Sequence, residues 1–285
     1  MAIEWSLRHN AEIISMDSAA IYRFMDIGTA KPDAQQRAAV AHHLIDLVDP
    51  TEDFSVAAYL EVARKTVDDI LNRGKNPLFV GGTPLYLKAL LRGLFDGPQA
   101  DWEYRKELAN QTELRGVQWL HDELERVDPT TAEKLHVNDT RRVVRALEVY
   151  RLTGQPISQW QQEHDKPIPQ DQCRVWALEL DRQTLNDRIE LRVDAMLDAG
   201  LVDEVRRLLD RFGGLSKMAA QAVGYRETID YLNGSLPPFD MQGRFVEGFP
   251  ALRETIILHT RQLAKRQMTW FRGLEECRLV KNIPE

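Results

Sequence analysis

Polar side chains and glycines follow three short apolar stretches of the chain, at the points where the stretches end. Asp17 with Ser18 follows EIISM, Asp49 with Pro50 follows HLIDLV, and Thr83 follows FVGG. A carboxylate, hydroxyl groups and glycines that allow close backbone approach can bind a polar ligand and accept its protons. If the stretches are parallel strands of one sheet, their carboxyl ends meet at the edge where ligands bind. The sequence therefore predicts a candidate site at these strand ends.

Each of these patterns also has an ordinary structural interpretation. Asp17 with Ser18 is typical of a helix N-cap, and Gly81, Gly82 and Thr83 are typical of a tight turn. Taken singly, each pattern favours the structural interpretation over the functional one.

Two basic clusters are further candidates for binding. The stretch TRRVVRALEVYR carries Arg141, Arg142, Arg145 and Arg151, and the stretch TRQLAKRQMTWFR carries Arg261, Lys265, Arg266 and Arg272. The formal net charge of −7 argues against a generally basic surface for DNA binding, because phosphate contacts need Lys and Arg. Each cluster alone is most often a solvated helix face, so neither indicates nucleic-acid binding by itself.

The elements that must position these residues alternate along the chain. Short apolar runs predict buried strands at residues 12–17, 43–48, 77–80 and 174–180, with a fifth at 278–280. Helical patterns lie between them, such as the one that opens at Ser55 and ends before Gly74. This alternation predicts an α/β fold with a parallel sheet flanked by helices.

A helical block interrupts the alternation. Strand patterns stop after Asp101 and resume at Arg174, and helices are predicted between them at residues 102–111, 117–126 and 141–152. We therefore expect an α/β core made of residues 1–101 and 166–285 and an inserted all-helical domain made of residues 102–165.

The composition is that of a globular protein without a membrane segment. The 285 residues are 43% hydrophobic and 28% charged, and no apolar run reaches the length of about 18 residues that spans a bilayer. The first residues, MAIEWSLRHN, lack the apolar core of a signal peptide, so we expect a cytoplasmic protein with no membrane partner. Cys173 and Cys277 have neither a metal-ligand nor a CxxC spacing, which predicts two reduced, buried thiols and no metal-ligating residues.

Five segments resemble, in this order, the signature segments of bacterial tRNA dimethylallyltransferases. They are SMDSAAIYRFMDIGTAKP, FVGGTPLYLKALLRGL, NDTRRVVRALEVY, AAQAVGYRETIDYLNG and TRQLAKRQMTWFR. The resemblance runs essentially from Ala2 to Arg272, and long ordered matches are far more specific than any short motif. The strand ends and the basic clusters thus acquire together a functional interpretation that none of them has alone.

The resemblance implies a fold and a reaction. The fold is a P-loop nucleotide-kinase-like parallel sheet flanked by helices, with the helical insertion contacting the anticodon stem-loop of tRNA. The reaction transfers a dimethylallyl group from dimethylallyl diphosphate to the exocyclic amine of the adenine 3′-adjacent to the anticodon, in tRNAs that read codons beginning with U. The product is isopentenyladenosine. The resemblance also implies Mg²⁺ as cofactor and a monomeric protein.

Within this resemblance, Asp17 is the expected catalytic residue. An aromatic exocyclic amine is a poor nucleophile, so a carboxylate that takes its proton as the new bond forms assists the reaction. Ser18, Ala19 and Ala20 are expected to border the adenine pocket, and Arg188 is expected to bind the diphosphate leaving group. The other implied tRNA-contacting positions are Thr83, Arg105, Arg141, Arg142, Val143, Val144, Arg145, Gln221, Ala222, Val223, Gly224, Tyr225 and Arg226.

Two segments keep a structural alternative. Arg188 and Arg192 lie four residues apart, as on a salt-bridged helix surface. The segment TRQLAKRQMTWFR is expected to be a core-packing helix with Trp270 and Phe271 buried, whether or not its basic residues reach RNA.

The family pattern begins with a strand and a phosphate loop of the form GPTxSGKT. The printed sequence contains no GxxxxGK[ST] motif, and Gly81 with Gly82 and Gly213 with Gly214 lack the lysine and hydroxyl at the required spacing. Such a loop supplies backbone N–H groups, a lysine and a metal-binding hydroxyl to a diphosphate. We therefore expect residues 1–285 to retain the tRNA side of the site and to bind the diphosphate poorly.

Two other functions remain open at this point. A catalytically inactive tRNA-binding protein of the same fold would keep the RNA contacts without the chemistry. A small-molecule kinase would share the α/β architecture, but it needs the phosphate loop and gives no reason for the arginine clusters. Binding of tRNA without product would support the first, and retention of ATP in place of dimethylallyl diphosphate would favour the second.

Overall fold

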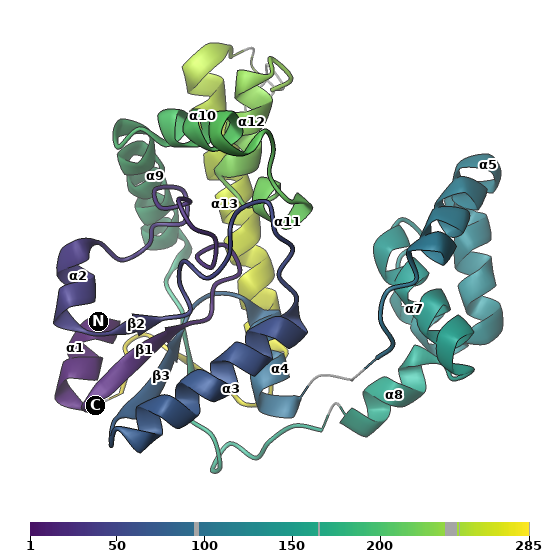
Figure 1. Cartoon of the computed structure of the whole chain (residues 1–285), viewed down its shortest axis with the longest axis horizontal. Coiled ribbons are helices and arrows are strands. Elements are labelled where there is room, and N and C mark those ends of the chain that lie inside the picture. Colours follow the sequence, from purple (N-terminus) through teal and green to yellow (C-terminus); the bar gives the residue numbers. More distant parts are fainter. Residues whose placement is uncertain (94–96, 165, 237–243, 245, 285) are drawn as a thin grey trace. The chain divides into compact units, whose positions relative to one another are not determined.

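The computed structural model describes residues 1–93, 97–164, 166–236, 244 and 246–284 (Figure 1). The chain divides into two compact units. The core unit consists of Met1–Ala89 and Pro169–Glu285, and the helical unit consists of Leu90–Ile168. The predicted insertion, residues 102–165, falls inside the helical unit.

Strand β1 (Ala11–Ser15) is the centre of a three-stranded parallel sheet in the core unit. It pairs with β2 (His42–His43) on one side and with β3 (Asn76–Val80) on the other, and Ile13 lies opposite Leu78. Most of β1 is buried, as expected for a central parallel strand that is covered on both faces.

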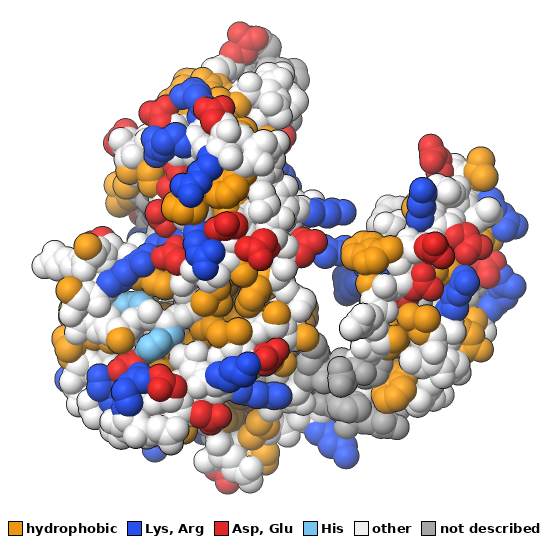
Figure 2. Space-filling model, in the orientation of Figure 1, with side chains coloured by type: hydrophobic (Ala, Val, Ile, Leu, Met, Phe, Trp, Pro, Cys, Tyr) orange, Lys and Arg blue, Asp and Glu red, His pale blue; other side chains and the backbone are white. Residues whose placement is uncertain are grey.

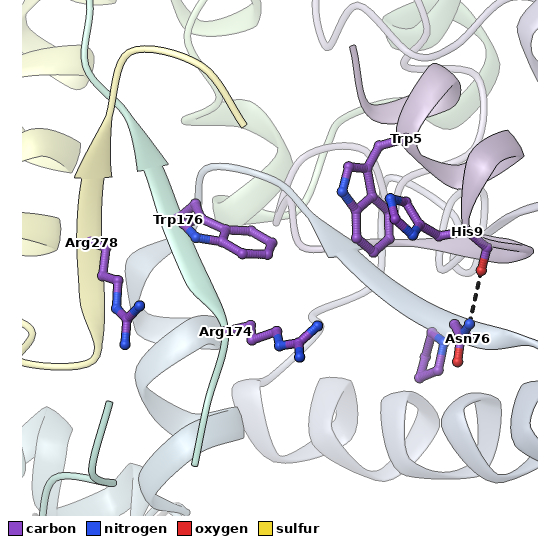
Figure 3. A pocket seen from close by; sticks show the side chains of 7 residues that line it. Trp5, His9, Asn76, Arg174, Trp176 and Arg278 are labelled. Carbon is purple, nitrogen blue, oxygen red and sulfur yellow. Dashed lines mark hydrogen bonds between the residues drawn. The ribbon is translucent and has the colours of Figure 1, made fainter. Parts of the chain in front are cut away.

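Strands β4 (Val175–Leu178) and β5 (Cys277–Val280) form a second parallel sheet. Neither β3 nor β4 has a further strand partner among the described residues, so each presents an unpaired edge. A cavity of 510 Å³ lies between these two strands (Figure 3). It is lined by Trp5, His9, Asn76, Pro77, Arg174, Trp176 and Arg278.

One predicted strand is wrong, and the other four are confirmed. The stretch 43–48 leaves the strand after its first residue, because Leu44 and Asp46 adopt φ of 62° and 58° in the left-handed region. The Asp46 carboxylate forms an ion pair with Lys31, whose Nζ lies 2.6 Å away, and this contact stabilises the left-handed backbone at Asp46. The apolar pattern of this stretch therefore belongs to a loop that packs on the core.

Helices pack around both sheets of the core unit. They are α1 (Ala2–Arg8), α2 (Ala34–Ala39), α3 (Val56–Asn72), α4 (Pro84–Arg92), α9 (Arg182–Asp198), α10 (Leu201–Phe212), α11 (Lys217–Ala220), α12 (Tyr225–Leu232) and α13 (Gly248–Arg272). As predicted, α3 starts after Ser55, whose Oγ accepts the N–H of Ala58 at 3.1 Å. None of the described helices is long and apolar enough to cross a membrane.

A hydrophobic cluster fixes the chain segment that follows Asp17. Ile21, Tyr22 and Met25 are at most 1% exposed and belong to a cluster with buried side chains of α9, α10, α12 and α13. Figure 1 shows α9, α10 and α12 gathered around the long helix α13. The loop after β1 is therefore built on helices that lie about 170 residues or more further along the chain.

The helical unit has its own apolar core. In the part that the structure describes, it contains α5 (Trp102–Val127), α6 (Pro129–Lys134), α7 (Thr140–Thr153) and α8 (Ile157–His164). Gly116, at φ 85° and ψ 164°, is not helical and divides α5 into two helical segments, which correspond to the helices predicted at 102–111 and 117–126. The core is made by Leu108, Leu120, Leu124, Ala132, Val143, Ala146, Leu147, Val149 and Ile157.

Candidate functional site

Asp17 follows the carboxyl end of β1 and stabilises a turn with its own side chain. Its Oδ1 accepts the backbone N–H groups of Ala19, at 2.8 Å, and Ala20, at 3.4 Å. Its Oδ2 accepts no hydrogen bond from the described residues. Asp17 therefore caps a turn and not a helix, and one carboxylate oxygen is free to accept a proton.

Thr83 joins the carboxyl end of β3 to this turn. Its Oγ1 accepts the backbone N–H of Ser18 at 3.0 Å and lies 3.3 Å from Ser18 Oγ. Gly81 permits the close approach, because a Cβ there would lie 2.2 Å from the carbonyl oxygen of Met16. The structure thus brings Asp17, Ser18 and Thr83 together at the ends of two adjacent parallel strands.

Asp49, at the third predicted strand end, does not join this group through a hydrogen bond. Its carboxylate pairs with Arg23, whose Nη1 lies 3.2 Å away, and its backbone N–H donates to Glu52 at 2.8 Å. Because the strand at 43–48 does not form beyond His43, Asp49 has no strand end to follow.

Arg188 and Arg192 lie one turn apart on α9, and solvent reaches both side chains. Neither forms an ion pair in the described part of the chain, so the alternative of a salt-bridged helix surface does not hold. The surrounding protein desolvates the Arg192 guanidinium and lowers its pKa, while the charge of Asp17 acts to raise it. Arg192 is thus a cation whose charge interacts with that of Asp17, an interaction that was not predicted from the sequence.

The segment at residues 221–226, called here the 221–226 turn, consists of a turn at 221–224 and the first two residues of α12, and it mixes exposed with buried residues. Gln221 and Arg226 are exposed, Ala222 and Val223 are partly buried, and Gly224 and Tyr225 are buried. The N–H of Gly224 donates to the buried Glu227 at 2.7 Å, and Arg226 Nη2 lies 3.2 Å from the same carboxylate. Among the predicted tRNA contacts of this turn, a partner can reach the side chains of Gln221 and Arg226 directly.

Glu148 organises two of the predicted RNA-binding arginines in the helical unit. It is fully buried and accepts two hydrogen bonds from Arg105, at 2.7 and 2.8 Å, and a further one from Arg145. Burial raises the pKa of Glu148, but the hydrogen bonds from the two arginines outweigh it, and the pKa lies below its usual value. Arg105 and Arg145 therefore neutralise a buried carboxylate, a role that the sequence did not indicate.

The other predicted positions on α7 differ in exposure. Arg141 and Arg142 are exposed, and Arg142 pairs with Asp139 near the start of the helix. Val143 is 1% exposed in the core of the helical unit, and Val144 is partly buried. Of these side chains, Arg141 and Arg142 are the ones that α7 offers to a partner.

A family model described as IPP transferase matches residues 20–274 of the chain. This chain belongs to the IPP transferase family. A protein of Acetivibrio thermocellus named tRNA dimethylallyltransferase is 44% identical over 276 residues, which cover 96% of this chain and 85% of the relative. A protein of the same name from Thiobacillus denitrificans is 46% identical over 274 residues, which cover 96% of this chain and 84% of the relative.

Solved structures of the IPP transferase family have the same fold. The tRNA isopentenylpyrophosphate transferase of Bacillus halodurans superposes with a TM-score of 0.66 at 38% identity, over 98% of this chain and 84% of the other. A eukaryotic dimethylallyltransferase acting on tRNA superposes with a TM-score of 0.73 at 26% identity, over 98% of this chain and 69% of the other. The α/β fold with a parallel sheet and a P-loop-like architecture is therefore confirmed.

In this IPP transferase family member, the second half of α13 is less buried than predicted. Trp270 is 45% exposed, so the prediction that it is buried is wrong, and Phe271 is partly buried. The fully buried residues of α13 all lie in its first half, up to Ile257. In the second half, Gln267 Nε2 donates to the carbonyl of Gly82 at 2.6 Å, a polar contact in place of apolar packing.

The charges of the surface are mixed in sign. Figure 2 shows Lys and Arg side chains interspersed with Asp and Glu over the face that it presents. On α13, Arg261 pairs with Glu190 and Arg272 pairs with Glu179, whereas Lys265 and Arg266 are exposed. Basic side chains are thus available at particular positions and not as a continuous basic surface.

Metal and thiol chemistry have little support in the described residues. No group of three or more His, Cys, Asp or Glu side chains there could hold a metal ion. Protein-bound Mg²⁺ usually keeps several waters and is held by one or two carboxylates together with substrate phosphates. Asp17 is a carboxylate near two hydroxyls, so the described residues do not make a metal site by themselves. Cys173 and Cys277 form no disulfide with each other, and both are partly buried, so the prediction that they are buried is wrong.

Proposed function

We propose that this chain transfers a dimethylallyl group from dimethylallyl diphosphate to the exocyclic amine of the adenine 3′-adjacent to the anticodon of tRNA, which gives isopentenyladenosine. The observation that carries the proposal is the match to relatives named tRNA dimethylallyltransferase at 44–46% identity over 96% of this chain. The reaction forms a bond between the amine nitrogen and the terminal carbon of the dimethylallyl group. The bond from that carbon to the diphosphate oxygen breaks, and its electron pair leaves with the diphosphate.

In this proposal Asp17 is the general base. The amine nitrogen must lose a proton as it bonds to carbon, and a positioned carboxylate that takes the proton lowers the barrier. Two backbone N–H groups orient Asp17 through Oδ1, which leaves Oδ2 to receive the proton. Ser18, Ala19 and Ala20 border the adenine, and Thr83 fixes Ser18 through its backbone N–H.

The leaving diphosphate needs positive charge and hydrogen-bond donors. We assign Arg188 to this role, and the unpaired state of its guanidinium among the described residues supports the assignment. Mg²⁺ stays a proposal, as an ion that would arrive with the diphosphate and screen its charge.

For tRNA, we propose that the anticodon stem-loop meets the exposed side chains of the predicted set, namely Arg141, Arg142, Gln221 and Arg226. Their exposure supports direct contact with RNA. Arg105, Arg145 and Tyr225 support the same surfaces from within, through their contacts with buried carboxylates. We expect a monomeric cytoplasmic enzyme.

The alternative of a catalytically inactive tRNA-binding protein is less favoured. The relatives are named for a transferase activity, and the carboxylate that the chemistry requires is present and oriented. Because the inactive protein would bind tRNA as well, product formation is the observation that separates the two functions.

The test is single-turnover prenyl transfer, measured beside tRNA affinity, in the printed chain and in a version that also carries the GPTxSGKT loop of the family pattern. Asp17→Asn should lower the chemical step about 10²–10⁴-fold, the range of general acid–base catalysis, with little change in tRNA affinity. Asp68→Asn, at an exposed carboxylate on α3, is the matched control and should leave both unchanged. A near-normal rate in Asp17→Asn would remove Asp17 from the mechanism, and tRNA binding without product in both versions would favour the inactive protein.

A further inference from the structure

Glu204 is a buried carboxylate that the proposed chemistry does not use. It lies on α10, is 5% exposed, and is flanked on its helix by the fully buried Leu201, Val205 and Leu208. Taking a carboxylate out of water is costly unless hydrogen bonds replace its hydration. Glu204 forms no ion pair with a described residue, so its replacement partners are neutral donors.

These donors come from two segments that are far apart in the sequence. The backbone N–H groups of Asp26 and Ile27 donate to the Glu204 carboxylate at 3.1 and 2.9 Å, and the hydroxyl of Tyr225 donates to it at 2.6 Å. Gly28 lies against the Tyr225 ring so closely that a Cβ there would be 2.4 Å from a ring carbon. The carboxylate thus joins the loop at 26–28 to the start of α12.

Each joined segment is continuous with a surface that is assigned to tRNA. The loop at 26–28 ends the segment that begins with the Asp17 turn, and Ile21, Tyr22 and Met25 between them are buried in one cluster. Tyr225 lies within the turn at 221–226. The segment from Asp17 to Gly28 is thus fixed near its start by Thr83, which binds the backbone N–H of Ser18, and near its end by Glu204, which binds the backbone N–H of Asp26.

We propose that Glu204 is a positioning residue, which holds the Asp17 turn and the 221–226 turn in one preformed surface for tRNA. This inference rests on the proposed function. A surface that is already ordered in the free protein loses less conformational entropy when tRNA binds. Glu204 reaches no substrate in this role and acts only through the two turns.

Glu204→Gln tests the inference in the full chain. The amide still accepts hydrogen bonds through its oxygen, but its NH₂ group faces donors that need an acceptor. We expect tRNA affinity to fall about tenfold, as for the loss of one or two hydrogen bonds, and the amides of Asp26 and Ile27 to exchange hydrogen at least about tenfold faster. The tRNA affinity and the exchange rates are both measured under conditions in which Glu204→Gln is fully folded.

Two matched controls separate positioning from general stability. Glu12→Gln removes an equally buried carboxylate, 4% exposed, at the amino end of β1, and should lower stability without weakening tRNA binding. Tyr225→Phe removes only the hydroxyl donor and should weaken tRNA binding severalfold. It keeps the measurement possible if Glu204→Gln does not fold. Its own control is Tyr59→Phe, whose hydroxyl donates at 3.0 Å to the carbonyl of Ser15.

The outcomes are distinct. Unchanged tRNA affinity in Glu204→Gln or Tyr225→Phe overturns the inference and leaves the proposed function standing. Equal weakening by Glu12→Gln and Glu204→Gln assigns Glu204 to general stability and also overturns it. Failure of the unaltered chain to bind tRNA overturns the proposed function, and the inference with it.

Discussion

Arg188 and Arg192 differ in their surroundings although both lie on the same helix. Arg188 is exposed without an ion pair among the described residues, whereas the pKa of Arg192 is lowered by desolvation, an effect that the charge of Asp17 opposes. A guanidinium without a carboxylate partner is free to bind an anion from solution. The two side chains therefore provide separate points at which an anionic substrate can be bound.

Arg188→Ala should weaken the use of dimethylallyl diphosphate. A charge-assisted contact to phosphate contributes about 1.5–3 kcal/mol, which predicts a rise of about 10–150-fold in the Michaelis constant for the donor. The effect on tRNA affinity should be small. Steady-state kinetics in the version with the phosphate loop measures the first effect, and a tRNA titration measures the second. Arg188→Lys, which keeps the charge without the planar fork, should be intermediate. Collapse of tRNA binding with an unchanged donor constant would show that Arg188 binds the other substrate.

Some of the site could be predicted from single residues, and some could not. Asp17, Ser18 and Thr83 were predictable because each follows an apolar run, and parallel strands bring such positions to one edge. The pairing of Arg105 with Glu148 could not be predicted, because the two residues are 43 positions apart and meet only when α5 packs on α7. The burial of Glu204 could not be predicted either, since a glutamate on an amphipathic helix is typical of the exposed face.

Among the elements, β1 is tied at its amino end to its neighbours by the buried Glu12. Its carboxylate accepts hydrogen bonds from Lys75 at 2.7 Å and Arg73 at 2.5 Å, and lies 2.7 Å from His43 Nε2. Burial raises the pKa of Glu12, but these partners outweigh burial and lower the pKa from 4.5 to about 2. The network joins β1 to β2, to the end of α3 and to the residue before β3.

This shift predicts how stability depends on pH. A carboxyl group whose pKa is lower in the folded state stabilises the fold above its unfolded pKa and loses that contribution as pH falls towards the folded pKa. The Glu12 contribution should therefore be complete above pH 4.5 and disappear as pH falls to about 2. Urea unfolding of the unaltered chain and of Glu12→Gln should show a difference in free energy that shrinks over this range. A difference that is constant with pH would contradict the assignment.

Substitution of two arginines of α7 should affect different properties, stability for Arg145 and tRNA binding for Arg141. Arg145→Ala leaves the fully buried Glu148 with one cation fewer, so it should lower the stability of the helical unit. Arg141→Ala, at an exposed side chain without an ion pair among the described residues, should leave stability unchanged and weaken tRNA binding. It should also reduce the slope of log affinity against log salt by about one, as for one phosphate contact. Thermal unfolding and tRNA titrations at several salt concentrations measure both effects, and an unchanged slope would show that Arg141 meets no phosphate.

The element predictions failed where a side chain overrode the local pattern. The run HLIDLV has the composition of a strand, but the Asp46 carboxylate binds Lys31 and holds the backbone in a left-handed conformation. Trp270 has the spacing of a core residue on an amphipathic helix, yet α13 extends beyond the cluster that buries its first half. Both outcomes depend on tertiary contacts that periodicity does not contain.

In the whole molecule, the unpaired edges of β3 and β4 border the 510 Å³ cavity of the core unit. Unpaired edges expose backbone donors and acceptors and invite pairing with another strand. The Trp5 Nε1 and Ser6 Oγ atoms are buried in α1 without a hydrogen-bond partner, and Trp5 lines the same cavity. This side of the core unit therefore combines two unpaired strand edges with buried polar atoms that lack a hydrogen-bond partner.

The last prediction compares residues 1–285 with a version that carries the strand and GPTxSGKT loop of the family pattern ahead of Met1. The loop adds a nest of backbone N–H groups, a lysine and a metal-binding hydroxyl, all of which act on a diphosphate and none of which tRNA requires. Binding of dimethylallyl diphosphate and turnover should therefore be far stronger in the longer version. The affinity for tRNA should be similar in both, because Asp17, Thr83 and the exposed arginines of α7 are common to both. It should fall steeply with salt, because the arginines contact phosphates.

The added strand should also pair with the open edges beside the cavity, so residues 1–285 should self-associate more readily than the longer version. Calorimetric titration with dimethylallyl diphosphate and magnesium, tRNA binding at two salt concentrations, and light scattering measure these three differences. A version with the loop lysine replaced by alanine is the control, since it restores the strand without the charge. It should lose most of the gain in donor binding and keep the gain in solubility. Equal donor affinity and equal turnover in the long and short chains would show that the diphosphate binds elsewhere, on residues that the printed sequence already contains.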